Sequence, residues 1–409
     1  MTRRSLPIYC LIFGGALLAT TNAARAVDKA PVPLFDGKTF DGWKKVGGGA
    51  TYRIEGGEIV GVVGPGSNTF LRTEKTYGDF RLELDCKLDV PGNSGIQFRS
   101  HQDKNKQGND HVFGYQCEID PSPRAWTAGI YAEGTPRGWL YPLTGHPEAQ
   151  KAFKLKDWNH FVIEARGPHL RTWLNGVACA DMLDTMELEG FIALQVHSGK
   201  AGKIRWKNIT IVDDGPSHWR PAFDGSTLHG WTPDGGGKWA VEGGEVRGTS
   251  ASPETRHGHL FSDATYGDFA LTLKFQAVRG NAGVYFRAGQ GGKSGVSGVQ
   301  VDIDPTKDTG GLYEIDGRGW LVRPSVEEFK KFYNAKPDAW NELSVIALGD
   351  RVVVQVNGKQ TADLRDEKIA RAGKIALQVH AGQDVDVRFK DNKVLKNLPK
   401  IGTDGGASR

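Results

Sequence analysis

The chain contains the same ordered set of motifs twice, and this internal repeat constrains its architecture more than any other feature. The segments FDG (35–37), TYGDF (76–80), RGWL (137–140) and ALQVH (193–197) recur in the same order at 223–225, 265–269, 318–321 and 376–380. The offset varies only from 181 to 189 residues, which is the size of a domain and too long for a solenoid repeat. We therefore predict two tandem copies of one domain, at 33–213 and 221–396, with a linker at 214–220 and a disordered tail at 397–409.

Both copies show the patterns of short β-strands joined by tight turns. Apolar and polar residues alternate along 80–88 (FRLELDCKL) and along 269–275, which is typical of half-buried strands. Asn-Gly pairs at 175–176 and 357–358 predict two-residue β-hairpins. Gly is abundant, at 55 residues, and only two stretches, near 147–153 and 326–332, favour helix. The expected fold is all-β, with two tandem β-sandwich (jelly-roll) domains.

Residues 1–26 have the pattern of a cleavable signal peptide. Arg3 and Arg4 precede an apolar stretch at 6–20, and Ala24-Arg25-Ala26 matches the small-residue pattern of a cleavage site. The apolar stretch is too short to span a membrane as a helix. We therefore expect a protein without a membrane span that is exported to the periplasm or secreted.

The charge balance and the cysteines narrow the classes of function. Lys and Arg number 52 against 48 Asp and Glu, and three of the arginines lie in the predicted signal peptide. This balance does not indicate a nucleic acid as a partner. Cys86, Cys117 and Cys179 remain outside that segment, and their odd number allows at most one disulfide. We interpret them as small buried apolar residues, because Cys86 and Cys117 continue apolar alternations.

Residues with proton-transfer and ligand-binding chemistry share one face of two strands in each copy. Alternation places them opposite the apolar face: Gln116, Glu118, Asp120, Gln195 and His197 in the first copy, and Gln300, Asp302, Asp304, Gln378 and His380 in the second. Arg99 and Arg287 end a further alternating strand and are expected to join them. A carboxylate beside an imidazole suits proton transfer near neutral pH. The same groups are potential ligands of a divalent metal, with Glu118, Asp120 and His197 as the candidate set.

These residues also have ordinary structural interpretations. Asp120 and Asp304 each precede a proline and can cap a turn. A single exposed acid, or His197 taken alone, is more often a solvated or structural residue than a catalyst. The pattern in the second copy is inherited by duplication and is not independent evidence. The residues alone therefore support a functional and a structural polar face about equally.

Aromatic residues gather in a Gly- and Pro-rich region after the carboxylate strand. They are Trp126, Tyr131, Trp139 and Tyr141, with Tyr313 and Trp320 as partial counterparts in the second copy. Rings beside acids and amides suit sugars, whose C–H faces stack on them. Core packing is the alternative role for at least half of these residues.

The motifs LFDGKTFDGW, GNSGIQFR, GYQCEIDP and GIYAEGTPRGWLYP resemble the 3-keto-disaccharide hydrolase domain family. The resemblance covers nearly the whole first copy and, more loosely, the second. It implies a concanavalin A-like jelly roll and an enzyme that acts on glycosides oxidised to a ketone at C3. The carbonyl acidifies the C2 proton, so its removal lets the C1 aglycone leave, and water then adds to the unsaturated sugar to give net hydrolysis.

The resemblance also implies roles for particular residues. Glu118 or His197 would be the base at C2, His101 a further candidate acid, and Asp120 would orient the imidazole or bind a metal. The substrate would be held by Gln116, Gln195, Arg99, Tyr131 and Trp139. The second copy departs from the first, because Asp302 replaces Glu118 and Gly289 stands where the first copy has His101.

Two other functions remain open at the level of the sequence. Jelly-roll sandwiches also serve as non-catalytic carbohydrate-binding modules and as cell-surface interaction domains. A binding module would retain an intact glycoside, whereas an interaction domain would show no affinity for sugar.

Overall fold

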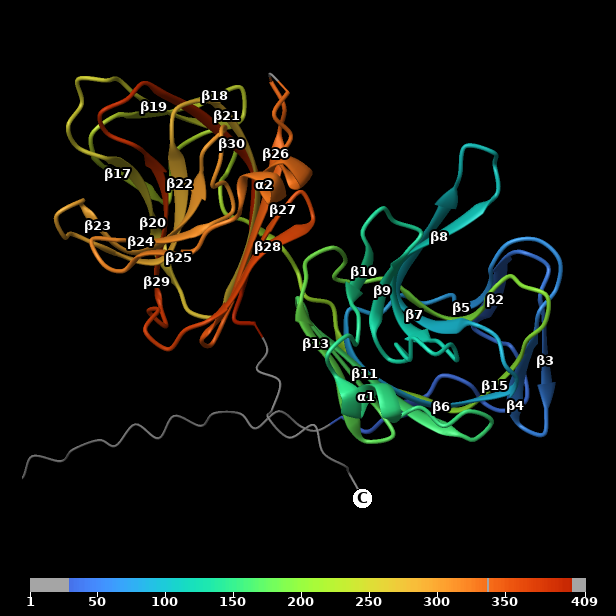
Figure 1. Cartoon of the computed structure of the whole chain (residues 1–409). Helices are drawn as coiled ribbons and strands as arrows, with labels where there is room; N and C mark the ends of the chain where they lie inside the picture. Colours follow the sequence, from blue (N-terminus) through green and yellow to red (C-terminus); the bar gives the residue numbers. More distant parts are fainter. Residues whose placement is uncertain (1–28, 337, 399–409) are drawn as a thin grey trace, which may run out of the picture.

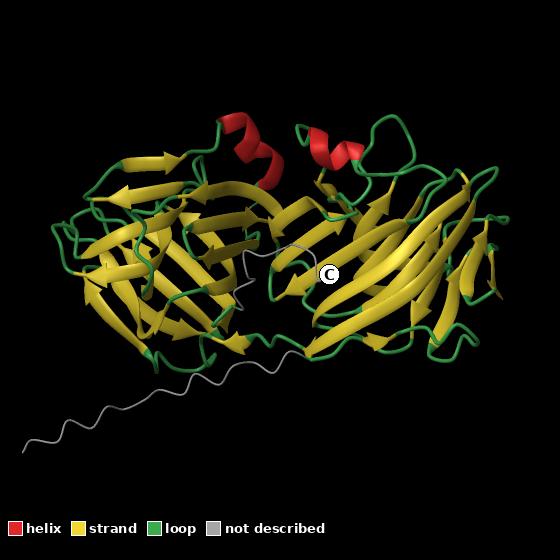
Figure 2. Cartoon of the chain, turned by 90° about the horizontal axis from the view of Figure 1, so that it is seen from below, coloured by secondary structure: helices red, strands yellow, loops and turns green. Residues whose placement is uncertain are grey.

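The computed structural model describes residues 29–336 and 338–398, and in these residues nearly all regular structure is β-strand (Figure 1). The predicted signal peptide and nearly all of the predicted tail lie outside the described residues. Among the helices that the structure describes, none has the length and apolar character needed to cross a bilayer. The strands form two sandwiches that lie side by side (Figure 2).

The first sandwich consists of two antiparallel sheets. In spatial order, one contains β13 (Val177–Leu183), β12 (His169–Leu174), β11 (Asn159–Arg166), β6 (Asp79–Val90), β15 (Lys203–Gly215), β4 (Glu58–Val62) and β3 (Thr51–Glu55), with β1 (Val32–Pro33) beside β15. The other contains β10 (Gly138–Tyr141), β9 (Ile130–Glu133), β8 (Asp110–Ile119), β7 (Ser94–Lys104), β14 (Phe191–Val196), β5 (Thr69–Thr73) and β2 (Trp43–Gly47). We call the second of these the pocket sheet.

The second sandwich repeats this strand order. One sheet contains β18 (Lys238–Glu242), β19 (Glu245–Ser250), β30 (Val385–Lys396), β21 (Phe269–Arg279), β26 (Asn341–Leu348), β27 (Arg351–Val356) and β28 (Lys359–Arg365), with β16 (Arg220–Pro221) beside β30. Its own pocket sheet contains β17 (Trp231–Gly235), β20 (Gly258–Tyr266), β29 (Gly373–Val379), β22 (Ala282–Gln290), β23 (Val296–Ile303), β24 (Leu312–Ile315) and β25 (Gly319–Val322). The all-β prediction with two tandem sandwiches is confirmed.

Local sequence signals account for the main elements. The alternating segment at 80–88 lies in β6, where its apolar side chains are buried and its polar side chains are partly exposed. Asn175 and Gly176 have φ values of 51° and 81°, the left-handed pair that a tight hairpin between β12 and β13 requires. The two helical stretches form α1 (Pro147–Lys151) and α2 (Val326–Phe332), and a Ser325–Glu328 capping box begins the second.

Each sandwich has its own apolar core between its two sheets. In the first, side chains from β6 and β11 pack against side chains from β7, β8 and β14, and the core includes Trp206, which is fully buried. The three cysteines outside the signal segment, Cys86, Cys117 and Cys179, are free and buried in this core. This agrees with their interpretation as small apolar residues.

The two sandwiches contact each other through a buried polar centre at Asp184. Its carboxylate accepts hydrogen bonds from Tyr115 (2.6 Å), from both terminal nitrogens of Arg137 (2.9 and 2.5 Å) and from Gln355 of the second sandwich (2.7 Å). Burial raises the pKa of this carboxyl, but the Arg137 guanidinium outweighs burial and holds it below its usual value. A small apolar cluster adjoins this centre, made of Leu183, Leu188, Ala270, Ile346, Val353, Leu395 and Leu398.

Candidate functional site

The pocket sheet of the first sandwich carries a polar cavity of about 350 Å³, a size that accommodates a small organic ligand. It is lined by Asn68, Asn93, Gln116, Glu118, Arg124, Tyr131, Glu133, Gly134, Trp139 and His197. Five of these residues are candidates from the sequence, namely Gln116, Glu118, Tyr131, Trp139 and His197. The structure thus places both candidate C2 bases in one pocket with Tyr131 and Trp139, the two aromatic residues expected to hold the substrate.

The polar face of β8 is buried as well as its apolar face. Gln116 and Glu118 are 2% and 4% exposed. Their side chains join one row of hydrogen bonds, in which Gln97 donates to Gln116 and Gln116 donates to Glu118 at 2.7 Å. Gly95 makes room for this row, because a Cβ there would lie 2.3 Å from Gln116 Cδ.

The Glu118 carboxyl is held at the pocket wall by two side-chain amides. Asn93 Nδ2 donates to it at 2.5 Å, in addition to the bond from Gln116. Burial raises the pKa of Glu118, and the nearby Asp120 charge adds to this effect. A carboxyl with a raised pKa can carry a proton at higher pH than an exposed one and can therefore serve as a general acid.

A second carboxyl, Glu133, faces the same cavity from the end of β9. Asn68 donates to it at 3.1 Å, and burial raises its pKa while the neighbouring His197 lowers it. Asn68 also accepts a hydrogen bond from the backbone N–H of Ser198 at 2.9 Å. The amide therefore connects Glu133 to the segment that carries the imidazole.

His197 is held in one tautomer by its own chain. Its Nδ1 lies 2.6 Å from the carbonyl oxygen of Ser198. A carbonyl only accepts hydrogen bonds, so Nδ1 carries the proton in this arrangement. In the neutral ring, Nε2 is then the basic nitrogen, and His197 lines the pocket with a lone pair available to remove a proton.

Arg124 supplies a positive charge at the pocket wall. Its guanidinium carbon lies 4.8 Å from the ring centres of both Trp126 and Trp139. Asp120 fixes it from the other side, accepting from Arg124 Nε at 2.9 Å. Asp120 also accepts the backbone N–H of Ser122 at 3.0 Å. The expected contact between Asp120 and the imidazole is therefore replaced by one with Arg124.

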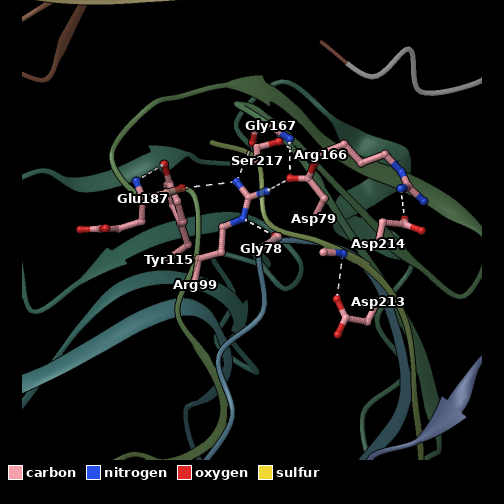
Figure 3. A network of polar contacts seen from close by, with 11 residues as sticks. Gly78, Asp79, Arg99, Tyr115, Arg166, Gly167, Glu187, Asp213, Asp214 and Ser217 are labelled. Atoms are coloured by element: carbon pink, nitrogen blue, oxygen red, sulfur yellow. Dashed lines mark hydrogen bonds and ion pairs between the residues drawn. The ribbon is translucent and has the colours of Figure 1, made fainter. Parts of the chain in front are cut away.

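Arg99 does not line this cavity, and Arg287 does not line the corresponding cavity of the second sandwich, contrary to their prediction as residues that join the other candidates. Both guanidinium groups are buried inside their sandwiches. Arg99 donates to the carbonyls of Gly78 (2.8 Å) and Gly167 (2.6 Å) and pairs with Asp79 (Figure 3). The reason is a bulge between Phe98 and His101, where Arg99 has a φ of 44° and its side chain leaves the alternation.

Two further candidates also lie outside the cavity lining. His101 follows the same bulge, pairs with Glu187 at 3.0 Å and stacks on Phe113. Gln195 is on β14 beside Gly95, and its side chain is fully buried. We therefore do not include His101 or Gln195 among the groups that contact a ligand.

The candidate metal ligands are dispersed in this structure. Across residues 29–336 and 338–398, no three His, Cys, Asp or Glu side chains are grouped closely enough to hold a metal ion. Glu118, Asp120 and His197 bond respectively to amides, to Arg124 and to a backbone carbonyl. A divalent metal at this set remains a prediction.

Besides Gly134, four lining residues were not anticipated from the sequence: Asn68, Asn93, Arg124 and Glu133. Asn93 begins the repeated motif 93–99, and Glu133 stands two residues after Tyr131 on the same face of β9. Asn93 could therefore have been predicted from the repeat, and Glu133 from the alternation along β9. Asn68 and Arg124 lie in connecting segments, where no periodicity applies.

The second sandwich has a corresponding cavity of about 340 Å³. It is lined by His257, Asn281, Gln300, Asp302, Asp304, Tyr313, Ile315, Trp320, Gln378, His380 and Gln383. All of the second-copy candidates except Arg287 therefore meet in one pocket. Asp302 accepts from Asn281 at 3.0 Å, just as Glu118 accepts from Asn93.

The Asp302 carboxyl makes stability depend on pH in a defined direction. Burial raises its pKa to about 7, so the folded state binds a proton that the unfolded chain releases near pH 4. The stability from this group is complete below about pH 4 and is lost as pH rises through about 7. We expect Asp302→Asn to flatten this fall, which reaches about 1.4 kcal/mol per pH unit. Urea unfolding of the wild-type protein and of the Asp302→Asn variant at several pH values tests this. If the free energy of unfolding depended on pH in the same way in both proteins, the prediction would be contradicted.

The fold and the two polar pockets define a protein of tandem jelly-roll sandwiches, each with a polar cavity on its pocket sheet. The model of the 3-keto-alpha-glucoside-1,2-lyase-like domain matches residues 30–212 and 218–395. The chain therefore belongs to this family, with two copies of the domain, and the resemblance noted in the sequence is confirmed. No curated protein matched the chain.

Comparison with solved structures gives matches that each cover less than half of this chain. A putative glycosyl hydrolase from Parabacteroides distasonis is 20% identical, with a TM-score of 0.34, and the match covers 45% of this chain and 93% of that one. The carbohydrate-binding module CBM66 from Bacillus subtilis is 19% identical, with a TM-score of 0.31, covering 41% and 96%. A B. subtilis protein of unknown function with a galectin-like fold is 14% identical, with a TM-score of 0.35, covering 45% and 96%.

Proposed function

We propose that the first sandwich is an exported enzyme that cleaves 3-keto-glycosides by elimination and hydration. Family membership supports a carbohydrate substrate. The observation that carries the proposal is the juxtaposition in one pocket of an imidazole with a free Nε2, a buried carboxyl with a raised pKa and an arginine. Elimination next to a ketone requires a base, an acid and a positive charge, and these three groups supply them.

In the first half of the reaction, His197 Nε2 takes the proton from C2, which is acidic because C3 is a carbonyl. The C2–H electron pair forms an enolate with C3, and Arg124 stabilises the negative charge on the C3 oxygen. Glu133 lines the same pocket, and its ionised form stabilises the imidazolium on His197.

In the second half, the enolate expels the C1 oxygen and a C1–C2 double bond forms. Glu118 gives its proton to the departing oxygen, so the aglycone leaves as a neutral alcohol. Water then adds at C1 and a proton returns to C2, which restores the saturated 3-keto sugar. One water is consumed and one glycosidic bond is broken, with no change in oxidation state.

The test compares two substrates that differ only at C3. The full exported chain is incubated with p-nitrophenyl 3-keto-α-glucoside and with p-nitrophenyl α-glucoside, and nitrophenol release is followed. We expect release from the keto sugar to be at least about 100-fold faster, because only a C3 carbonyl acidifies the C2 proton. A parallel assay with a chelator tests the predicted divalent metal.

Equal rates on the two substrates would contradict the elimination mechanism. No release from either, together with measurable affinity for the sugar, would favour the alternative function of a non-catalytic carbohydrate-binding module. A chain with neither turnover nor affinity would favour the interaction-domain alternative.

A further inference from the structure

The two pockets can be compared residue by residue, because the strand registers of the two pocket sheets coincide. Gln116 pairs with Tyr131 across β8 and β9, and Gln300 pairs with Tyr313 across β23 and β24. Two positions further along β9 and β24, Glu133 in the first pocket corresponds to Ile315 in the second. By the same comparison at β5 and β20, Asn68 corresponds to His257.

The second pocket retains the groups that would recognise a sugar. Its aromatic pair, Tyr313 and Trp320, has ring centres 5.2 Å apart at 74°, against 5.3 Å and 64° for Tyr131 and Trp139. The amides of Asn281 and Gln300 and the carboxyl of Asp302 repeat the hydrogen-bonded row on the opposite wall. The cavity volumes are also nearly equal.

Unpaired polar atoms in the second pocket indicate that a ligand completes it. Gln300 and Gln378 both line the cavity and are 5% and 1% exposed, and the Oε1 atom of each is buried without a hydrogen-bond partner. In the first pocket, the equivalent of Gln300 is Gln116, whose Oε1 accepts from Gln97, a residue that Tyr285 replaces in the second copy. Gln195, the equivalent of Gln378, also has unpartnered amide atoms, but it lies outside the lining of the first cavity. Buried amide oxygens without partners are costly, so donors from a polyhydroxyl ligand would stabilise this pocket.

The same pocket lacks a counterpart of Glu133, the carboxyl that would stabilise a protonated imidazole in the first pocket. His380 has the tautomer of His197, with Nδ1 at 2.6 Å from the carbonyl oxygen of Ala381. Its surroundings are opposite, however. Ile315 replaces the carboxylate, and the ring of His257 lies with its centre 4.5 Å from that of His380. A proton taken up by His380 would therefore be destabilised by a neighbouring imidazole instead of being stabilised by Glu133.

Arginine is also displaced from the second pocket. Arg323 lies over the Trp320 ring, with its guanidinium carbon 5.0 Å from the ring centre, but it pairs with Asp308 and does not line the cavity. In the first pocket, Arg124 takes part in the lining itself. The second pocket therefore keeps its hydrogen-bonding and stacking groups and loses both charged partners of the proposed reaction.

We propose that the second sandwich is a carbohydrate-recognition domain that binds a neutral pyranoside in the pocket between Trp320 and Asp302 and does not cleave it. The chain then combines a pocket that cleaves a sugar with a pocket that binds a sugar without cleaving it. The two sandwiches that carry these pockets contact each other at Asp184. The absence of cleavage in the second pocket rests on the function proposed for the first pocket. Binding of a sugar in the second pocket does not depend on that function.

The experiment counts bound ligand per chain. Full-length protein carrying Glu118→Gln is titrated calorimetrically with methyl 3-keto-α-glucoside. We expect two equivalents, of which Trp320→Ala removes one and Trp139→Ala removes the other. Asn281→Ala, which removes an amide instead of a ring, should remove the same equivalent as Trp320→Ala. Thermal unfolding of each variant verifies that the sandwiches remain folded.

The outcomes separate the two proposals. A single equivalent that only Trp139→Ala removes would overturn binding in the second sandwich and leave the first pocket's function intact. If no variant bound any ligand, the result would contradict both the binding proposed for the second sandwich and the function proposed for the first. Product formation by the Glu118→Gln chain that Asn281→Ala abolishes would show that the second pocket cleaves, and would overturn the non-cleaving part of the inference.

Discussion

Replacing Glu118 by Gln is expected to slow cleavage of a 3-keto-glucoside by about 10²–10⁴-fold, the range for loss of a positioned general acid. Gln preserves the size, and its amide oxygen can still accept from one of the two donors, Asn93 or Gln116, so the pocket should keep its shape. The effect should fall on kcat with KM nearly unchanged, because only proton donation is removed. Steady-state kinetics on the purified full chain measure both constants.

The matched control is Asp302→Asn in the second pocket. We expect it to change the cleavage rate less than about twofold, since the lining of the second pocket lacks counterparts of Glu133 and Arg124. Equal losses from both variants would mean that the pockets act alike, contrary to the asymmetry seen at Glu133 and Ile315. In the wild-type chain, the rate should fall as pH rises above the raised pKa of Glu118, because the acid is then deprotonated.

Much of the fold follows from patterns with a clear physical basis. The repeat predicts two domains because copies of one sequence form copies of one fold. The alternation at 80–88 predicts β6 because alternate residues of a strand point to opposite faces, one toward the core and one toward solvent. The hairpin at Asn175 follows from the left-handed conformations that Asn and Gly tolerate. None of these signals specifies the contact between sandwiches at Asp184, which depends on side chains far apart in the sequence.

The candidate site was predictable where it lies on regular strands. Gln116 and Glu118 share a face of β8, and alternation is sufficient to place them together. The error at Arg99 has the opposite cause, because a bulge breaks the alternation and turns the side chain into the sandwich. Arg124 was missed because it comes from an irregular segment, where position depends on tertiary contacts with Asp120 and Trp126.

Replacing Arg99 by Met is expected to destabilise the first sandwich by about 3–5 kcal/mol, the cost of breaking a buried ion pair. Met keeps much of the aliphatic volume but leaves Asp79 without its counter-charge and the carbonyls of Gly78 and Gly167 without donors (Figure 3). Arg99→Lys should cost less, since it retains the charge with fewer donors. Urea unfolding followed by tryptophan fluorescence measures the change.

The equivalent variant in the second copy decides whether this network is a property of the fold or of the site. Arg287 repeats the arrangement, donating to the carbonyls of Gly267 (2.8 Å) and Gly349 (2.7 Å) and pairing with Asp268 (2.9 Å). Arg287→Met should therefore destabilise the second sandwich by a similar amount. If Arg99 contacted substrate instead, Arg99→Met would abolish cleavage and leave the unfolding curve in place. The buried position of Arg99 favours the first result, because a guanidinium enclosed by backbone carbonyls has no surface to offer a ligand.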